Sequence, residues 1–80
     1  MNKTIVVSGG TKGIGRAIIE RFGSKGFDIV TCARNQQDLD ELVSEMTGVK
    51  VYAMKADLSA ASQVKKFIDF VKASVNHVDV

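Results

Sequence analysis

The sequence predicts an α/β fold in which a doubly wound parallel sheet is covered by helices. Two observations support this prediction. Short apolar runs of β-type alternate with amphipathic, helix-like segments along the 80 residues, and such alternation forms parallel sheets through right-handed crossovers. A glycine-rich turn also separates the first apolar run from the first helix-like segment, as in a nucleotide-binding βαβ unit. The predicted strand order is 3-2-1, with a fourth strand just beginning.

The first predicted strand, residues 4–7, has the apolar character of a central strand in a parallel sheet. A helix is expected at residues 13–25, with Gly26 just beyond its C-terminus. Gly23 inside this helix is unfavourable by about 1 kcal/mol relative to alanine, and tight packing is the expected reason for it. The expected buried face carries Ile14, Ile18 and Phe22.

The second unit begins with a strand at residues 27–33. Asn35 is expected to cap the following helix, with Asp38 in its first turn, where the helix dipole favours an acid. Gly48 is expected to end the helix. Its apolar stripe consists of Leu39, Leu42, Val43 and Met46.

The third unit begins with a strand at residues 49–56, where Lys50 and Lys55 indicate partial exposure near a sheet edge. Ser59 is expected to cap the third helix. The buried face of this helix is expected to carry Ala60, Val64, Phe67, Ile68, Val71 and Val75. Residues 77–80 return to a β-like pattern, which is the expected start of the fourth strand.

The composition excludes several classes of function. The chain is 45% hydrophobic and 25% charged, which is typical of a soluble globular protein. Its net charge of +2 is small and its basic residues are scattered, so we expect no nucleic-acid partner. One cysteine permits neither an internal disulfide nor a zinc cluster, which fits a reducing cytoplasm. No apolar run approaches the ~20 residues of a membrane span, so we also expect no membrane partner.

Three glycine signatures compete for the turn after the first strand. The common dinucleotide fingerprint G-x-G-x-x-G fails, because Ile18 stands where the third glycine is required after Gly13 and Gly15. The alternative to all three nucleotide-binding signatures is a glycine-rich turn that binds no ligand. The strand before the turn and the helix after it favour a nucleotide site instead.

The second signature is the Walker A loop of phosphate-transferring proteins. Gly10 and Gly15 have the separation that this loop needs, but Arg16 and Ala17 occupy the positions of its Lys and Ser/Thr. The lysine contacts the terminal phosphates and the hydroxyl holds Mg²⁺. A nucleotide triphosphatase is therefore disfavoured.

The third signature, [ST]-G-x-x-x-G-I-G, is met in full by Ser8, Gly9, Gly13, Ile14 and Gly15. This stretch resembles the cofactor loop of the short-chain dehydrogenase/reductase family, and the resemblance covers essentially the whole chain. It implies a Rossmann-like sheet of which residues 1–80 are the amino-terminal, cofactor-binding portion, within a single domain that continues beyond them.

The end of the second strand is expected to determine the choice of cofactor. In NAD-dependent members of the family an acid falls at about the position of Ala33, whereas an arginine directly after it, here Arg34, marks members that use NADP. A basic residue before the second glycine of the loop, here Lys12, is a further mark of NADP use. Asp28 lies at the wrong end of its strand to contact the ribose. Lys12 and Arg34 could also be solvated surface charges, but both flank one predicted pocket.

Asp57 and Leu58, after the third strand, resemble the pair of the family that contacts adenine. Asp57 could instead belong to the cap of the following helix. Tyr52 and Lys55 do not form the catalytic Tyr-x-x-x-Lys pair of the family, because they are three apart in a strand and point to opposite faces.

Two other reactive residue types are expected to be structural. Cys32 is interpreted as a small buried hydrophobic residue, because no base accompanies it. His77 is interpreted as structural or exposed.

The resemblance implies an NADP(H)-dependent oxidoreductase that transfers hydride between the nicotinamide and a carbonyl or alcohol carbon. The catalytic tyrosine is expected beyond residue 80, and the complete protein is expected to be a cytoplasmic homo-oligomer. A non-catalytic protein that binds or senses NADP on the same fold is the alternative. The implied cofactor-binding residues are Ser8, Gly9, Thr11, Lys12, Gly13, Ile14, Gly15, Arg34, Asp57 and Leu58.

Overall fold

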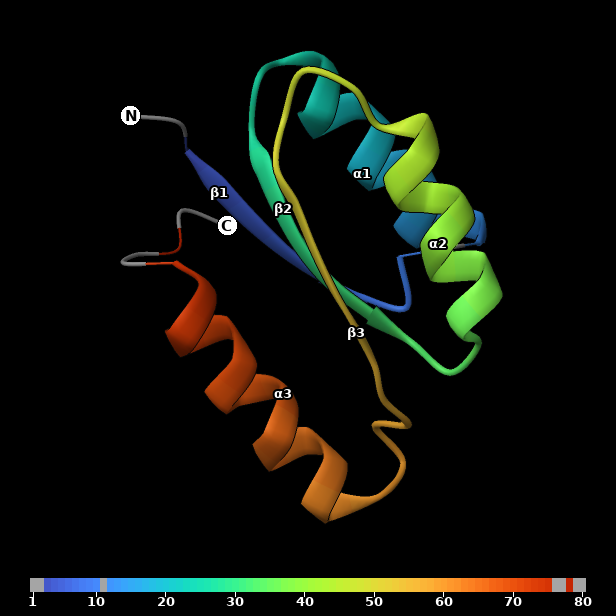
Figure 1. Cartoon of the computed structure of the whole chain (residues 1–80), viewed down its shortest axis with the longest axis vertical. Coiled ribbons are helices and arrows are strands. Elements are labelled where there is room, and N and C mark those ends of the chain that lie inside the picture. The colour runs from blue at the N-terminus through green and yellow to red at the C-terminus, as the bar shows by residue number, and fades with distance from the viewer. Residues whose placement is uncertain (1–2, 11, 76–77, 79–80) are drawn as a thin grey trace.

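The computed structural model describes residues 3–10, 12–75 and 78. Its elements alternate between strand and helix, as the sequence predicts (Figure 1). In chain order they are β1 (Thr4–Ser8), α1 (Gly13–Ser24), β2 (Asp28–Ala33), α2 (Gln36–Glu45), β3 (Val51–Lys55) and α3 (Ala61–Ser74).

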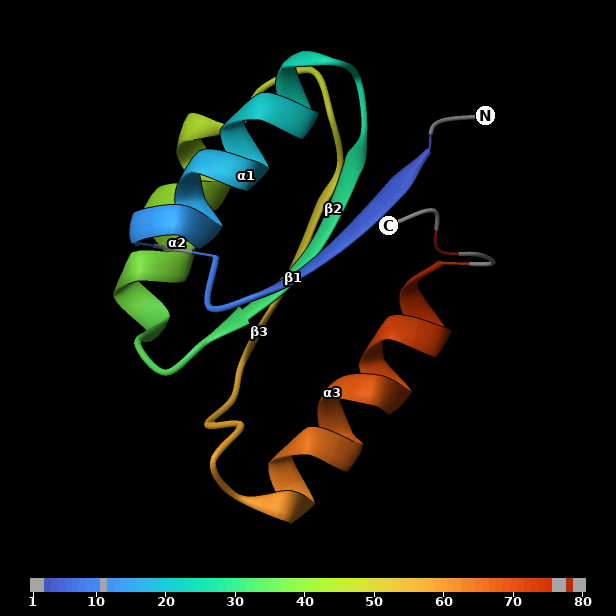
Figure 2. The same ribbon diagram turned by 180° about the vertical axis from the view of Figure 1, so that it is seen from behind.

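The three strands form one parallel sheet in the order β1-β2-β3, which confirms the predicted order 3-2-1. The register pairs Val7 with Thr31, and Ala33 with Lys55. Helices α1 and α2 lie on one face of the sheet and α3 lies on the other (Figures 1 and 2). Because the strands are parallel, the carboxyl ends of all three lie at the same edge of the sheet.

The core has two layers, one on each face of the sheet. Alternate residues of β2 face opposite layers, as Ile29 and Val30 do, and both are fully buried. The layer beneath α1 and α2 consists of Ile5, Val7, Ile19, Ile29 and Leu42. The layer beneath α3 consists of Val30, Cys32, Ala56 and Phe67.

Phe22 packs against the core as predicted, but the rest of the predicted buried face of α1 is wrong by about one residue. Ile19 is the buried residue of α1, whereas Ile14 is 81% exposed and Ile18 is also exposed. Gly15, Ile19 and Phe22 follow helical spacing on the side that meets β1 and β2. Successive helix residues are rotated by about 100°, so the stripe that contains Ile14 and Ile18 turns away from the sheet.

The predicted stripes of α2 and α3 are too wide. Leu39 and Leu42 are buried as expected, but Val43 is exposed. On α3, the side chains that pack against the sheet are Phe67, Phe70, Val71 and Val75. Val64, Ile68 and Ala60 are exposed at its flank or its start, because α3 packs mainly on β2 and β3.

One of the two expected helix caps is confirmed. The side chain of Asn35 accepts a hydrogen bond from the backbone N–H of Asp38 at 3.2 Å. The cap predicted for Ser59 is wrong, because the N-cap residue of α3 is Ala60 and the Ser59 side chain bonds Asp57 instead. The expected fourth strand and His77 lie outside the described residues, apart from Val78.

Candidate functional site

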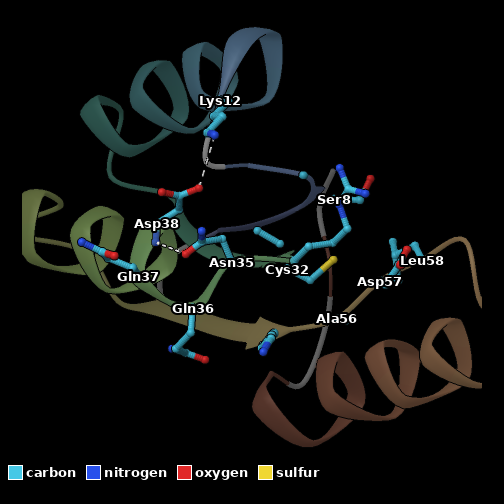
Figure 3. Close-up of a pocket in the computed structure, with 14 residues that line it drawn as sticks. Ser8, Lys12, Cys32, Asn35, Gln36, Gln37, Asp38, Ala56, Asp57 and Leu58 are labelled. Atoms are coloured by element: carbon cyan, nitrogen blue, oxygen red, sulfur yellow. Dashed lines mark hydrogen bonds and ion pairs between the residues drawn. The ribbon is translucent and has the colours of Figure 1, made fainter.

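A pocket of about 950 Å³ lies at the carboxyl ends of the three strands (Figure 3). This volume is within the range of about 300–1,000 Å³ that is typical of small-molecule and cofactor sites. The position also fits the rule that open parallel sheets bind ligands beyond the carboxyl ends of their strands. The lining residues are Ser8, Gly9, Lys12, Cys32, Ala33, Arg34, Asn35, Gln36, Gln37, Asp38, Lys55, Ala56, Asp57 and Leu58.

The loop after β1 brings the N-terminus of α1 to the pocket. Gly9 and Gly13 have φ values of +66° and +59°, which side chains other than glycine rarely adopt. The N-cap residue Lys12 makes no side-chain capping bond, and the first turn of α1 holds no acid. Backbone N–H groups in this turn can therefore donate to an anion, which the helix dipole also favours.

Two further glycines, Gly10 of the loop and Gly15 of α1, are needed for packing. A Cβ on Gly15 would lie 2.5 Å from the carbonyl oxygen of Gly9, so at this position α1 presses directly on the loop. A Cβ on Gly10 would collide with the Thr31 hydroxyl, which itself donates to the carbonyl oxygen of Val7 at 2.6 Å. The loop is therefore held between the helix and the core.

We expect Gly15→Ala to lower the free energy of unfolding by about 1–3 kcal/mol, because the clash is with backbone that cannot rotate away. Gly23→Ala is the matched control. Its Cβ would collide with the end of the Met46 side chain, which is flexible and can move, and would lie at ordinary contact distance, 3.6 Å, from Cδ1 of Ile29. Alanine also gains about 1 kcal/mol of helix propensity over glycine. Thermal melts of the two variants of the intact protein test the difference. Equal effects would contradict this role for Gly15.

Arg16 supports the rejection of the Walker A signature. Its guanidinium forms ion pairs with Glu20, at 2.9 Å, and with Glu45 of α2. Arg16 therefore connects α1 to α2, and it is not among the residues that line the pocket.

Three cationic side chains, those of Arg34, Lys55 and Lys12, line the pocket. Arg34 follows β2, and Lys55 ends β3 beside Ala33 in the sheet register. Both also line a smaller adjoining hollow. Lys12 approaches from the α1 loop, and its Nζ lies 3.6 Å from Oδ2 of Asp38. Residue 33, which ends β2, is alanine and not an acid.

Asp57 is held by the turn that follows β3. Its Oδ1 accepts hydrogen bonds from the Ser59 hydroxyl at 2.7 Å and from the Ser59 N–H at 3.0 Å. These bonds, helped by the positive charge of Arg34, lower the pKa of Asp57 below its ordinary value of 3.8. Because both bonds end on Oδ1, Oδ2 can accept from a ligand.

We expect Ser59→Ala to raise the pKa of Asp57 toward its ordinary value, because the hydroxyl is the largest cause of the shift. A lowered folded-state pKa stabilises the fold above the unfolded value, and this stabilisation is lost as pH falls through the folded value. The stabilisation that Ser59→Ala weakens is thus complete above about pH 3.8 and declines as pH falls below that value. An NMR titration of the Asp57 carboxyl carbon measures it. Ser44→Ala is the control, since its hydroxyl donates only to the Glu41 carbonyl.

Cys32 lies at the floor of the pocket and is buried, as the sequence predicts. Burial raises the pKa of its thiol, which makes the reactive thiolate scarcer at neutral pH. Its carbonyl oxygen accepts from the N–H of Gly9 at 2.9 Å. This contact connects the loop to β2 and gives Cys32 a structural role.

The pocket brings together Ser8, Gly9, Lys12, Arg34, Asp57 and Leu58 of the predicted cofactor-binding residues. Gly13, Ile14 and Gly15 lie in the adjacent first turn of α1 but do not line the pocket. Thr11 lies outside the described residues. Asp28 lies at the start of β2, where its carboxylate accepts from the N–H of Lys50.

The sequence did not indicate Asp38 or Lys55 as residues of the site. Lys55 ends β3 and Asp57 lies two residues later; a spacing of two in extended chain places two residues on one side, and this was an available signal. The sequence pattern indicates Asp38 only as an acid in the first turn of a helix.

Within the described ranges, no helix is long and apolar enough to cross a membrane. The same residues contain no group of three or more Asp, Glu, His or Cys side chains that could hold a metal ion.

Residues 3–80 match the family model described as short chain dehydrogenase. The chain belongs to the short-chain dehydrogenase/reductase family. A tropinone reductase homologue from Datura stramonium is 40% identical over 75 residues, which are 91% of this chain and 28% of that protein. The chain thus spans less than a third of this relative.

Solved structures of the family share the fold. The alcohol dehydrogenase of Thermococcus sibiricus, complexed with 5-hydroxy-NADP, matches 99% of this chain with a TM-score of 0.93 and 29% identity, over 35% of its own length. A short-chain dehydrogenase/reductase from Burkholderia phymatum, in complex with NAD, matches 96% of this chain with a TM-score of 0.88 and 26% identity, over 28% of its own length. Both cofactors thus occur among similar structures.

Proposed function

We propose that this chain is the amino-terminal, cofactor-binding portion of an NADP(H)-dependent oxidoreductase. The observation that carries the proposal is the pocket rim. Arg34 and Lys55 at two strand ends and Lys12 at the start of α1 all line it, and residue 33 is alanine and not an acid. A 2′-phosphate carries close to two negative charges, so such a rim favours NADP over NAD. The greater length of the relatives supports a domain that continues beyond residue 80.

Each part of the site has a role in this proposal. N–H groups in the first turn of α1 donate to the pyrophosphate, and Arg34 and Lys12 bind the 2′-phosphate. Asp57 accepts from the adenine amino group through Oδ2, with help from the backbone at Leu58. The bound cofactor supplies hydride transfer to or from a carbonyl or alcohol carbon.

The direct test is the dissociation constant of NADPH and of NADH for the intact protein, measured by fluorescence titration. We expect NADPH to bind more tightly. Equal affinities would refute the assignment of cofactor, and binding of neither would refute the site.

Turnover separates the enzyme from its alternative, a non-catalytic NADP-binding or sensing protein. The only tyrosine in residues 1–80, Tyr52, lies in β3 and packs in the layer beneath α3. Residues 1–80 therefore include no tyrosine placed to act as the catalytic acid. NADPH oxidation with a panel of small carbonyl compounds supports the enzyme, and binding without oxidation supports the alternative. Cytoplasmic location and homo-oligomeric assembly belong to the same proposal, and cell fractionation and sedimentation of the intact protein test them.

A further inference from the structure

An ion pair crosses the rim of the pocket and joins two elements of the site. Nζ of Lys12, at the start of α1, lies 3.6 Å from Oδ2 of Asp38 in the first turn of α2 (Figure 3). Both residues line the pocket. One of the cations assigned to the 2′-phosphate thus already has a carboxylate partner.

The two members of the pair differ in exposure. Asp38 is held by the first turn of α2, where its N–H donates to the Asn35 side chain, and its own side chain is only 25% exposed. The Lys12 side chain is 81% exposed. The separation of 3.6 Å is longer than a normal hydrogen bond, and exposed pairs of this kind are weak. Lys12 can therefore exchange Asp38 for another anion, whereas the Asp38 carboxylate stays at the rim.

We propose that Asp38 is a specificity-determining residue that competes with the 2′-phosphate for Lys12 and so limits the preference for NADP(H). The inference rests on the proposed function of the pocket. Binding of the phosphate requires Lys12 to give up part of its interaction with Asp38, and it places the phosphate near a fixed negative charge. NAD(H) has a neutral hydroxyl at this position, so neither effect opposes its binding.

The test is Asp38→Asn in the intact protein. Asparagine keeps the shape of the side chain and the backbone cap, and it removes the charge. We expect the dissociation constant of NADPH to fall by about 3- to 10-fold at low salt, as for one partly exposed charge close to the phosphate. The constant for NADH should change by less than about 2-fold.

Glu41→Gln is the matched control, because it removes the same charge from an exposed position on α2 that does not line the pocket. It should leave both constants unchanged. Thermal melts of both variants check that α2 remains folded.

A double-mutant cycle tests whether Asp38 acts through Lys12. The gain from Asp38→Asn should shrink when Lys12 is replaced by Met, because the competition has then been removed. An equal gain in both backgrounds would overturn the competition, and unchanged or weaker NADPH binding by Asp38→Asn would overturn the inference as a whole.

The two proposals fail separately. A wild-type protein that binds NADPH no better than NADH refutes the assignment of cofactor. In that protein, a gain in NADPH affinity from Asp38→Asn would still support Asp38 as the competing group, and no gain would refute it. Binding of neither nucleotide by any of these proteins would refute both.

Discussion

Gly13→Val should weaken NADPH binding to the intact protein by at least about 100-fold. Gly13 opens α1 with φ +59°, and among the described residues no atom beyond its chain neighbours and the backbone of its own helix turn lies within 4 Å of the position that its Cβ would take. In our proposal this open space lets the cofactor phosphates reach the N–H groups of the first turn. Valine would place two methyl groups there, and its β-branched side chain disfavours a positive φ.

Backbone strain caused by valine at a positive φ must be distinguished from loss of the phosphate-binding site. Gly26→Val is the matched control, since Gly26 has φ +86°, also has open space around its Cβ position, and lies beyond the other end of α1. Both variants should melt at lower temperature. Only Gly13→Val should change the dissociation constant of NADPH, and unchanged affinity in this variant would refute the assignment of the loop.

The order and type of the elements follow from local pattern, and this is why they were predictable. Apolar runs and amphipathic stripes are properties of neighbouring residues, so β2 was expected at residues 27–33 and is observed at Asp28–Ala33. The rotation of α1 was not predictable in this way. It is set by the contact between Gly15 and the backbone of Gly9, which is a property of the folded chain.

The site was predictable where strand direction alone brings residues together. Ser8, Arg34 and Asp57 lie at or just after the ends of three parallel strands, so their meeting at one edge of the sheet follows from the fold class. The neighbours of Lys12 could not be predicted in this way. Its pairing with Asp38 depends on how the start of α2 is placed against the α1 loop, which no local pattern encodes.

Arg34→Leu combined with Ala33→Asp should reverse the preference of the intact protein from NADPH to NADH, with a change in the ratio of dissociation constants of about 100-fold. Arg34 is exposed, so its bond to the phosphate should contribute about 1 kcal/mol, or about 5-fold, after screening by solvent. Lys12 and Lys55 remain in this variant, so Arg34→Leu alone should reduce the preference without abolishing it.

The introduced aspartate should supply the larger part of the change. Its carboxylate would repel the 2′-phosphate of NADPH and accept a hydrogen bond from the free 2′-hydroxyl of NADH. Arg21→Leu, which removes a cation from the exposed surface of α1 outside the pocket, is the control and should leave the ratio unchanged. The preference of the unmodified protein should weaken as salt rises, because it arises from partly exposed charges. If the unmodified protein binds NADH as tightly as NADPH at low salt, Arg34 is a surface charge and the pocket does not select the phosphate.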